Sequence, residues 1–301
     1  MPQIKVEPVP YGGWPNCYRV SDGETELVVT TDVGPRVMRF GFVGGQNLFV
    51  EIADQLGKSG ERWWAMRGGH RLWISPEVKP DTYALDNGPV KATVHETAIS
   101  LLQPVEPETG LQKEINVAYH GSSVQVTHRI ANRGAAMRRL APWALSQMAP
   151  GGIGIAAFPP RGGHSEQLLP TNPLTMWAYT NFADKRWMLM NKYIALQQDA
   201  NDHSPQKAGL FNVDTRAAYL LGQELFIKRA QADAKAEYPD FGCSFEMFTN
   251  GDFLELETLG ALVDLGPGES VEHVESWSLH RGMQIAGFSE AEVERVIEAL
   301  L

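Results

Sequence analysis

Cysteine is scarce in this chain, which has only 2 of them among 301 residues. Cys17 and Cys243 lie far apart and fit neither a metal-binding spacing nor a disulfide framework. We therefore predict that both are small buried residues of a protein that works in a reducing compartment. We also expect no metal and no other cofactor at the functional site.

Concentrated positive charge and long apolar runs are missing as well. The chain has 26 basic and 36 acidic residues, a formal net charge of -10, and no cluster of five or more basic residues. Because nucleic acids and anionic membranes attract concentrated Lys and Arg, we predict neither as a partner. No apolar run approaches the roughly 18 residues of a membrane span, and the N-terminal residues form no apolar signal segment. We expect a cytoplasmic protein, whose oligomeric state the sequence leaves open.

Strand patterns dominate the sequence, with turn residues at the spacing that is typical of a β-sandwich. They predict strands at residues 25–33, 36–43, 91–102, 111–120, 123–131, 138–148, 192–198, 217–228 and 270–279. Only the tail, residues 289–301, has a helical pattern, with Ser289 and Glu292 as a capping box. We predict an all-β fold in one domain over residues 1–301, a large antiparallel two-sheet β-sandwich with a short C-terminal helix at 288–301.

Residues 243–258 predict a β-hairpin that carries three carboxylates on one face. A two-residue turn at Asn250-Gly251, the strongest short hairpin signal, pairs Glu246 with Glu255 and puts Glu257 on the same face. The other face is apolar and consists of Phe245, Met247, Leu254 and Leu256. Because like charges opposite each other are destabilising, we expect cations of a functional pocket to compensate the carboxylates.

Residues 62–77 read RWWAMRGGHRLWISPE and combine aromatic with ion-pairing side chains. Trp63, Trp64 and Trp73 form an aromatic cluster, which is surrounded by Arg67, His70, Arg71 and Glu77. Aromatic platforms beside polar groups are typical of sugar sites. The alternative is a loop that closes the core and is held by an Arg-Glu pair. No serine nucleophile elbow, phosphate loop or dinucleotide fingerprint is present.

Several other polar residues allow two interpretations each. Lys113 shares the apolar face of its strand, so its amine either extends to the surface or faces a pocket. Asp184 and Arg186 follow Trp177 in a loop rich in proline, glycine and aromatics, and form either a salt bridge or substrate contacts. His128 is interpreted as a core histidine. The same-face pair of His273 and Glu275 is interpreted as part of a solvated surface, because two ligands alone are weak evidence for a metal.

The order of these motifs resembles the galactose mutarotase-like superfamily, which includes aldose 1-epimerases and hexose-6-phosphate mutarotases. The matching segments are residues 68–73 (GGHRLW), 76–77 (PE), 141–143 (APW) and 255–260 (ELETLG). The likeness covers roughly residues 11–280 and looks closest to an uncharacterised bacterial family of that superfamily. It implies a mutarotase-type supersandwich with a sugar site that needs no cofactor.

The resemblance also implies roles for individual residues. In aldose 1-epimerases the glutamate of a late Leu-Glu-Thr strand takes the proton of the anomeric hydroxyl, and Glu257 stands at that position. The acid histidine of those enzymes aligns with Trp143, which leaves His70 as the candidate acid, with Arg71 second. The expected sugar-binding residues are Arg67, Arg71, Trp73, Glu77, Lys113, Trp143, Trp177, Asp184, Arg186, Glu246 and Glu255. A carbohydrate lyase or glycoside hydrolase on this scaffold, and a non-catalytic sugar-binding protein, are the alternatives.

Overall fold

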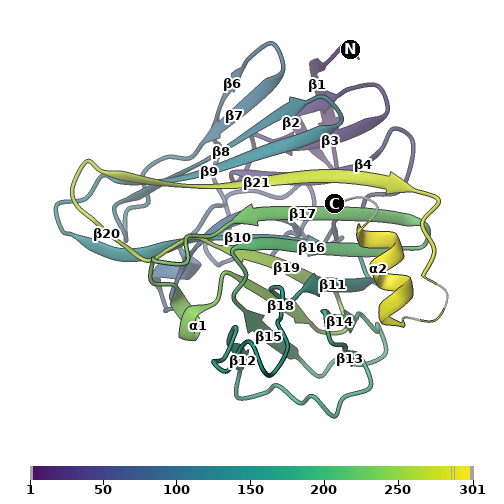
Figure 1. Ribbon diagram of the computed structural model, residues 1–301. Coiled ribbons are helices and arrows are strands. Elements are labelled where there is room, and N and C mark those ends of the chain that lie inside the picture. The colour runs from purple at the N-terminus through teal and green to yellow at the C-terminus, as the bar shows by residue number, and fades with distance from the viewer. Residues whose placement is uncertain (1–2, 286, 288, 299–301) are drawn as a thin grey trace.

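A computed structural model of the chain describes residues 3–285, 287 and 289–298. Within these residues the chain forms an eleven-stranded and a ten-stranded sheet, both antiparallel. Figure 1 shows the N-terminal strands β1 to β4 at the back of the view and β21 and β17 of the other sheet in front. The predicted all-β, two-sheet antiparallel sandwich is therefore confirmed.

The first sheet has, in spatial order, β1 (Lys5–Tyr11), β2 (Trp14–Ser21), β3 (Thr25–Thr30), β4 (Arg36–Phe42), β5 (Gly69–Ser75), β10 (Arg138–Met148), β19 (Leu254–Leu259), β18 (Phe245–Thr249), β15 (Gln206–Leu210) and β12 (Leu174–Met176), with β20 (Val263–Leu265) paired to β10. The second sheet has β13 (Trp187–Leu189), β14 (Tyr193–Gln197), β11 (Ile153–Ala157), β16 (Asp214–Leu221), β17 (Glu224–Gln231), β21 (Ser270–Arg281), β9 (Ser123–Asn132), β8 (Leu111–His120), β7 (Ala98–Leu102) and β6 (Lys91–Val94). The helical segments are η1 (Asp81–Tyr83), α1 (Pro239–Gly242) and α2 (Glu290–Glu298).

The main hydrophobic core lies between the two sheets. Strand alternation sends Leu72, Ile74, Leu254 and Leu256 of the first sheet into this core, where they join Trp277 of the second. We call this side of the first sheet its inner face, and the side turned away from the second sheet its outer face. Cys17 and Cys243 are buried free thiols, as predicted.

Helix α2 covers part of the second sheet on the side away from the core. Val293, Val296 and Ile297 pack there against apolar residues of β11, β14, β16 and β17, and Figure 1 shows the helix at the right-hand end of the sandwich. Ser289 directly precedes it, as the capping box predicts. Residues 288 and 299–301 of the predicted tail lie outside the described residues. No helix in the described part of the chain is long and apolar enough to span a membrane.

Three segments differ from the predicted strand pattern. Residues 91–102, predicted as one strand, form the two paired strands β6 and β7. Residues 217–228, predicted as one strand, contain the turn between β16 and β17, because Gly222 adopts a φ of 61° there. Residues 69–75, which were not among the predicted strands, form the central strand β5, in which every residue is buried. A strand that is buried on both faces does not need alternating polar and apolar residues. The sequence pattern that identifies other strands is therefore missing here.

The 243–258 hairpin has the predicted faces and a different register. Glu246 pairs with Glu257 and Phe248 with Glu255, a shift of two residues from the predicted pairing. The turn spans residues 250–253, and the Asn250 side chain accepts hydrogen bonds from the backbone N–H groups of Asp252 and Phe253. A shift by two preserves the faces, so the carboxylates still share one side.

Candidate functional site

The candidate site lies on the outer face of the first sheet, where neighbouring strands place polar residues in two rows. One row runs across β5, β10, β19 and β18 and contains Arg71, Leu145, Glu257 and Glu246. The adjacent row contains Gln147, Glu255, Phe248 and Lys207, the last from β15. Residues separated by up to about 190 positions in sequence therefore meet on one surface.

Lys207 lies between two carboxylates. Its Nζ is 2.7 Å from Oε2 of Glu246 and 2.9 Å from Oε2 of Glu257, and both carboxylates are completely buried. The ammonium also lies 4.7 Å from the ring centroid of Trp143 and 4.8 Å from that of Trp177, within the range of cation–π attraction. Trp143 donates its Nε1–H to Glu257 Oε2 at 2.8 Å.

The three charged groups do not all ionise. Burial holds the pKa of Glu246 well above its usual range, against the lowering effect of Lys207. Burial also opposes the charge of Lys207, but Glu246 and Glu257 raise its pKa well above the usual value. We conclude that a neutral Glu246 lies beside an ion pair of Lys207 with Glu257, which limits the buried net charge.

A cavity of about 240 Å³ opens above this cluster. Aromatic rings form most of its wall, and Trp143, Lys207 and Glu255 are among its lining residues. The remaining lining residues are Trp64, Met66, Trp73, Glu77, Tyr83, Leu145, Tyr179, Phe248, Asn250 and Phe253. Rings that stack on C–H faces, together with a few fixed polar groups, are the elements of a small-molecule site for a sugar.

Glu255 is one of the two carboxylates that line this cavity, the other being Glu77. Its Oε1 accepts a hydrogen bond of 2.8 Å from Gln147 Nε2. Burial, followed by the neighbouring Glu257, raises the pKa of Glu255 to about 8. Glu255 is therefore mostly protonated at neutral pH, whereas Glu257 is held in an ion pair.

Arg67 and Arg71, the two arginines of the 62–77 segment that were predicted to bind the sugar, do not line the cavity. Arg67 is completely buried and bonds to Glu61 and to Asn87 Oδ1, which matches the interpretation of a loop closed by an Arg-Glu pair. Arg71 lies beneath the cavity, with its guanidinium carbon 4.5 Å from the Trp73 ring centroid and 5.0 Å from that of Trp64. Burial lowers the pKa of Arg71 to about 9.

His70 lies on the opposite face of the sheet from Glu257. It is completely buried, its Nδ1 is 2.9 Å from Ser146 Oγ, and its Nε2 is 2.7 Å from His128 Nε2. Strand β5 alternates, so Arg71 and Trp73 face the cavity side while His70 faces the core. The structure therefore does not bring the predicted acid to the predicted base.

His70 belongs to a buried network between the sheets. Within the described residues, His70, His128 and Glu275 form a group whose ligand atoms lie within 4.8 Å, but Lys228 Nζ already binds Glu275 at 2.9 Å. His273 and Glu275 are both buried, so the prediction that they lie on a solvated surface is wrong: β21 is an interior strand between β17 and β9. His128 is a core histidine as predicted.

Three further predicted substrate contacts lie away from the cavity. Lys113 is on β8 of the second sheet and is buried against Glu106, with its Nζ 2.7 Å from Oε1. Arg186 binds Asp184 through Nη2 at 2.7 Å and the backbone carbonyl of Ser204 at 2.8 Å, the salt-bridge alternative of the sequence. Of the predicted set, Trp73, Glu77, Trp143 and Glu255 line the cavity, and Trp177, Glu246 and Glu257 contact Lys207 or adjoin it.

Sequence reasoning did not identify Lys207, Gln147, Tyr83 or Tyr179. Lys207 alternates with the apolar Ala208 and Leu210 over a single short strand, which is a weak signal. Gln147 and the two tyrosines occupy segments with no motif. The pairing of β15 with β18 brings Lys207 to the hairpin, and the pairing of β10 with β19 brings Gln147 there.

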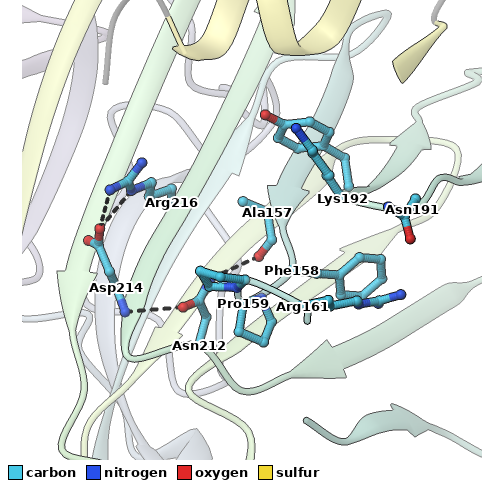
Figure 2. A pocket seen from close by; sticks show the side chains of 11 residues that line it. Ala157, Phe158, Pro159, Arg161, Asn191, Lys192, Asn212, Asp214 and Arg216 are labelled. Atoms are coloured by element: carbon cyan, nitrogen blue, oxygen red, sulfur yellow. Dashed lines mark hydrogen bonds and ion pairs between the residues drawn. The ribbon is translucent and has the colours of Figure 1, made fainter. Parts of the chain in front are cut away.

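A second cavity, of about 400 Å³, lies on the other sheet where β11 ends and β14 and β16 begin. Figure 2 shows Arg216 and Lys192 on two sides of it and Arg161 near Phe158. Arg216 pairs with Asp214, and Lys192 pairs with Glu294. None of the predicted site residues lines this cavity, so it is distinct from the candidate site.

Comparisons with known proteins identify the fold. No family model and no curated protein matches the sequence. The structure is similar to the Slr1438 protein from Synechocystis sp. PCC 6803, with a TM-score of 0.58, 12% identity, and coverage of 91% of this chain and 99% of that one. A galactose mutarotase-like protein from Lactobacillus casei gives a TM-score of 0.58 at 8% identity, covering 88% and 100%. A galactose mutarotase related enzyme from Lactobacillus acidophilus gives 0.54 at 10%, covering 88% and 98%.

These similarities extend over nearly the full length of each protein. The chain therefore has the galactose mutarotase-like fold that its motifs suggest. At identities of 8 to 12% a shared fold does not carry an activity across. The chemistry has to be argued from the residues around the cavity.

Proposed function

We propose that the protein is a carbohydrate-binding isomerase of the aldose 1-epimerase type, which interconverts the anomers of a sugar by acid and base catalysis. Glu257 is the proposed base, which takes the proton of the anomeric hydroxyl. The observation that supports this proposal is that two residues lining an aromatic cavity, Trp143 and Lys207, both bind Glu257 Oε2.

The second oxygen of Glu257 is free to accept a proton. Oε1 is buried and has no hydrogen-bond partner among the described residues. A buried carboxylate oxygen without a donor is costly, and a sugar hydroxyl is one group that would satisfy it. Because Glu257 lies behind Trp143 and Lys207, the hydroxyl has to enter between these two side chains.

The charges of the site favour an uncharged sugar over a phosphorylated or acidic one. Lys207 is the one cation among the residues that line the cavity, and it is already bound to Glu246 and Glu257. Arg67 is held by Glu61, and Arg71 is buried beneath two indole rings. A phosphate group needs free Arg or Lys donors, which the cavity does not offer.

The proposal is tested by Glu257→Gln assayed for anomer interconversion by polarimetry across a panel of neutral aldoses. General base catalysis contributes about 10²–10⁴-fold, so the variant should lose activity by that factor. Glu272→Gln, an exposed carboxylate on β21 of the other sheet, is the matched control and should retain it. Unchanged rates in Glu257→Gln would contradict the mechanism.

A further inference from the structure

We propose that Glu255 is the proton donor of this site, the residue that delivers a proton to the ring oxygen of the bound sugar. The inference rests on the proposed anomer interconversion and assigns the acid, for which His70 is unsuitable because it faces the core. Unlike the histidine, Glu255 lines the cavity.

The geometry places the two carboxylates on the same side of the sugar site. Glu255 and Glu257 are two residues apart on β19, so their side chains share the outer face at a spacing of about 6.6 Å along the strand. The hydroxyl and ring oxygens at an anomeric carbon are neighbours, so carboxylates at this spacing can address one each.

The surroundings of Glu255 keep its proton available. Gln147 donates to Oε1, which by itself favours the ionised form. No cation of the described residues, however, lies within ion-pairing distance of this carboxylate, whereas Glu257 has Lys207. The charged and titratable groups around Glu255 are Glu257 on the same strand, Lys207 on β15, Arg71 on β5 and Tyr83 on η1. Burial and Glu257 outweigh the two cations, and the pKa of about 8 suits a donor at neutral pH.

Lys207 is less suited to the same role, although it also lines the cavity. Its pKa is raised well above the usual value because two carboxylates stabilise the ammonium. It remains charged and gives up a proton reluctantly. We assign it to hold Glu257 in place and to keep that base ionised.

The proposed step conserves protons and electrons. Glu257 takes the proton of the anomeric hydroxyl, whose oxygen electrons form the aldehyde carbonyl as the bond from the anomeric carbon to the ring oxygen breaks. The ring oxygen takes the electrons of that bond and the proton of Glu255. The product is the open-chain aldehyde beside an ionised Glu255 and a protonated Glu257. Rotation of the aldehyde and the reverse step give the other anomer and restore both carboxyl groups.

The test measures interconversion rates of the full chain and of two variants, Glu255→Gln and Glu255→Asp. We expect Glu255→Gln to reduce kcat at least 100-fold while KM stays within about threefold, because the amide keeps hydrogen bonding and cannot donate a proton as an acid. Glu255→Asp keeps an ionisable acid and should retain more activity than the amide. In the wild type kcat should fall as the pH rises through about 8, and this decline should be absent from the residual activity of Glu255→Gln.

An independent readout is the carboxyl infrared band of protein labelled with ¹³C-glutamate, taken as the difference between wild type and Glu255→Gln. We expect a protonated carboxyl signal at pH 6 that disappears with a midpoint near 8. A fully ionised Glu255 at pH 6, or a folded Glu255→Gln with wild-type kcat, overturns the proposal. If wild type itself interconverts no aldose, the proposed function fails together with the acid assignment. If only Glu257→Gln is inactive, the acid assignment alone fails.

Discussion

Glu246 and Glu257 face each other directly across β18 and β19, and one ammonium group, that of Lys207, binds both. Two buried carboxylates at this separation cannot both carry a charge against a single cation without a large cost. Burial holds the pKa of Glu246 well above its usual range, whereas its partner Glu257 also accepts the Trp143 indole N–H. A pairing that looks unfavourable in the sequence therefore selects which glutamate is ionised.

Replacement of Lys207 by Met removes the only cation that binds this pair in the described part of the chain. Loss of one partner of a buried ion pair costs about 3–5 kcal/mol, because the other charge is left uncompensated. We expect the free energy of unfolding, measured by urea denaturation, to fall by that amount at pH 7. We also expect no measurable anomer interconversion.

Glu246→Gln is the matched control for Lys207→Met. Because Glu246 is already neutral, the amide replaces a protonated carboxyl of nearly the same shape. The free energy of unfolding should change by less than about 1 kcal/mol. A loss as large as that of Lys207→Met would show that Glu246 is ionised.

Trp143→Phe separates the hydrogen bond to Glu257 from the aromatic wall of the cavity. The variant keeps a ring and loses the Nε1–H donor at 2.8 Å. A hydrogen bond to a charged group contributes about 1.5–3 kcal/mol, so kcat should fall roughly 10- to 100-fold if that bond orients the base in the transition state. Trp73→Phe is the matched control. Trp73 lines the same cavity, and its Nε1 has no hydrogen-bond partner among the described residues. This control should therefore change kcat little, and equal losses in both variants would mean that indole size alone matters.

The hairpin illustrates how much of the site the sequence can predict. Its two faces follow from alternation alone and are confirmed. The predicted register is wrong because Asn-Gly predicts a turn in which glycine adopts a positive φ. Gly251 is required for a different reason: a Cβ at this position would lie 2.2 Å from the His203 ring. Close approach of a residue some 50 positions away is a tertiary contact that no local pattern contains.

The position of His70 on a strand explains why it was wrongly predicted as the acid. No strand was predicted around His70, so the direction of its side chain was left open, and β5 turns it toward the core. The missing partner of the carboxylates is Lys207, on a five-residue strand about 40 positions before the hairpin. The compensating cation could be inferred from the charge of the hairpin, but its identity depends on sheet order.

Ligand charge should decide which sugars stabilise the protein. We expect neutral aldoses to raise the melting temperature in a thermal-shift assay and their 6-phosphates to have no effect through this cavity, because the charge of Lys207 is already paired with the buried Glu246 and Glu257. Any shift from phosphosugars should persist in Glu255→Gln and disappear in Arg161→Ala, since Arg161 lines the second cavity. A shift from phosphosugars that depends on Arg71 instead would contradict the uncharged substrate.

Acid should destabilise the protein through the buried histidines. Burial lowers the pKa of His273 to about 3 and that of His70 well below its usual range, so the folded protein keeps both neutral. The unfolded chain takes up protons near the ordinary histidine pKa of about 6.5. This contribution to stability is therefore complete above pH 6.5 and is lost as the pH falls toward 3, by up to about 1.4 kcal/mol per pH unit for each histidine. The contribution of Glu255 to stability depends on pH in the opposite direction. Because its pKa is raised in the folded protein, stability falls as the pH rises from about 4.5 to 8.

Comparing wild type with a histidine variant separates the contribution of His273 to stability from that of Glu255. The free energy of unfolding of wild type minus that of His273→Gln, measured by urea denaturation from pH 7.5 to 4.5, should decrease steadily as the pH falls below 6.5. Glutamine does not titrate in this pH range. In wild type, by contrast, His273 stays neutral in the folded protein and becomes protonated in the unfolded chain. Val274→Ala, the next residue on β21 and 44% exposed, does not titrate and should differ from wild type by the same amount at every pH. A constant difference for His273→Gln as well would mean that His273 is protonated in the folded protein.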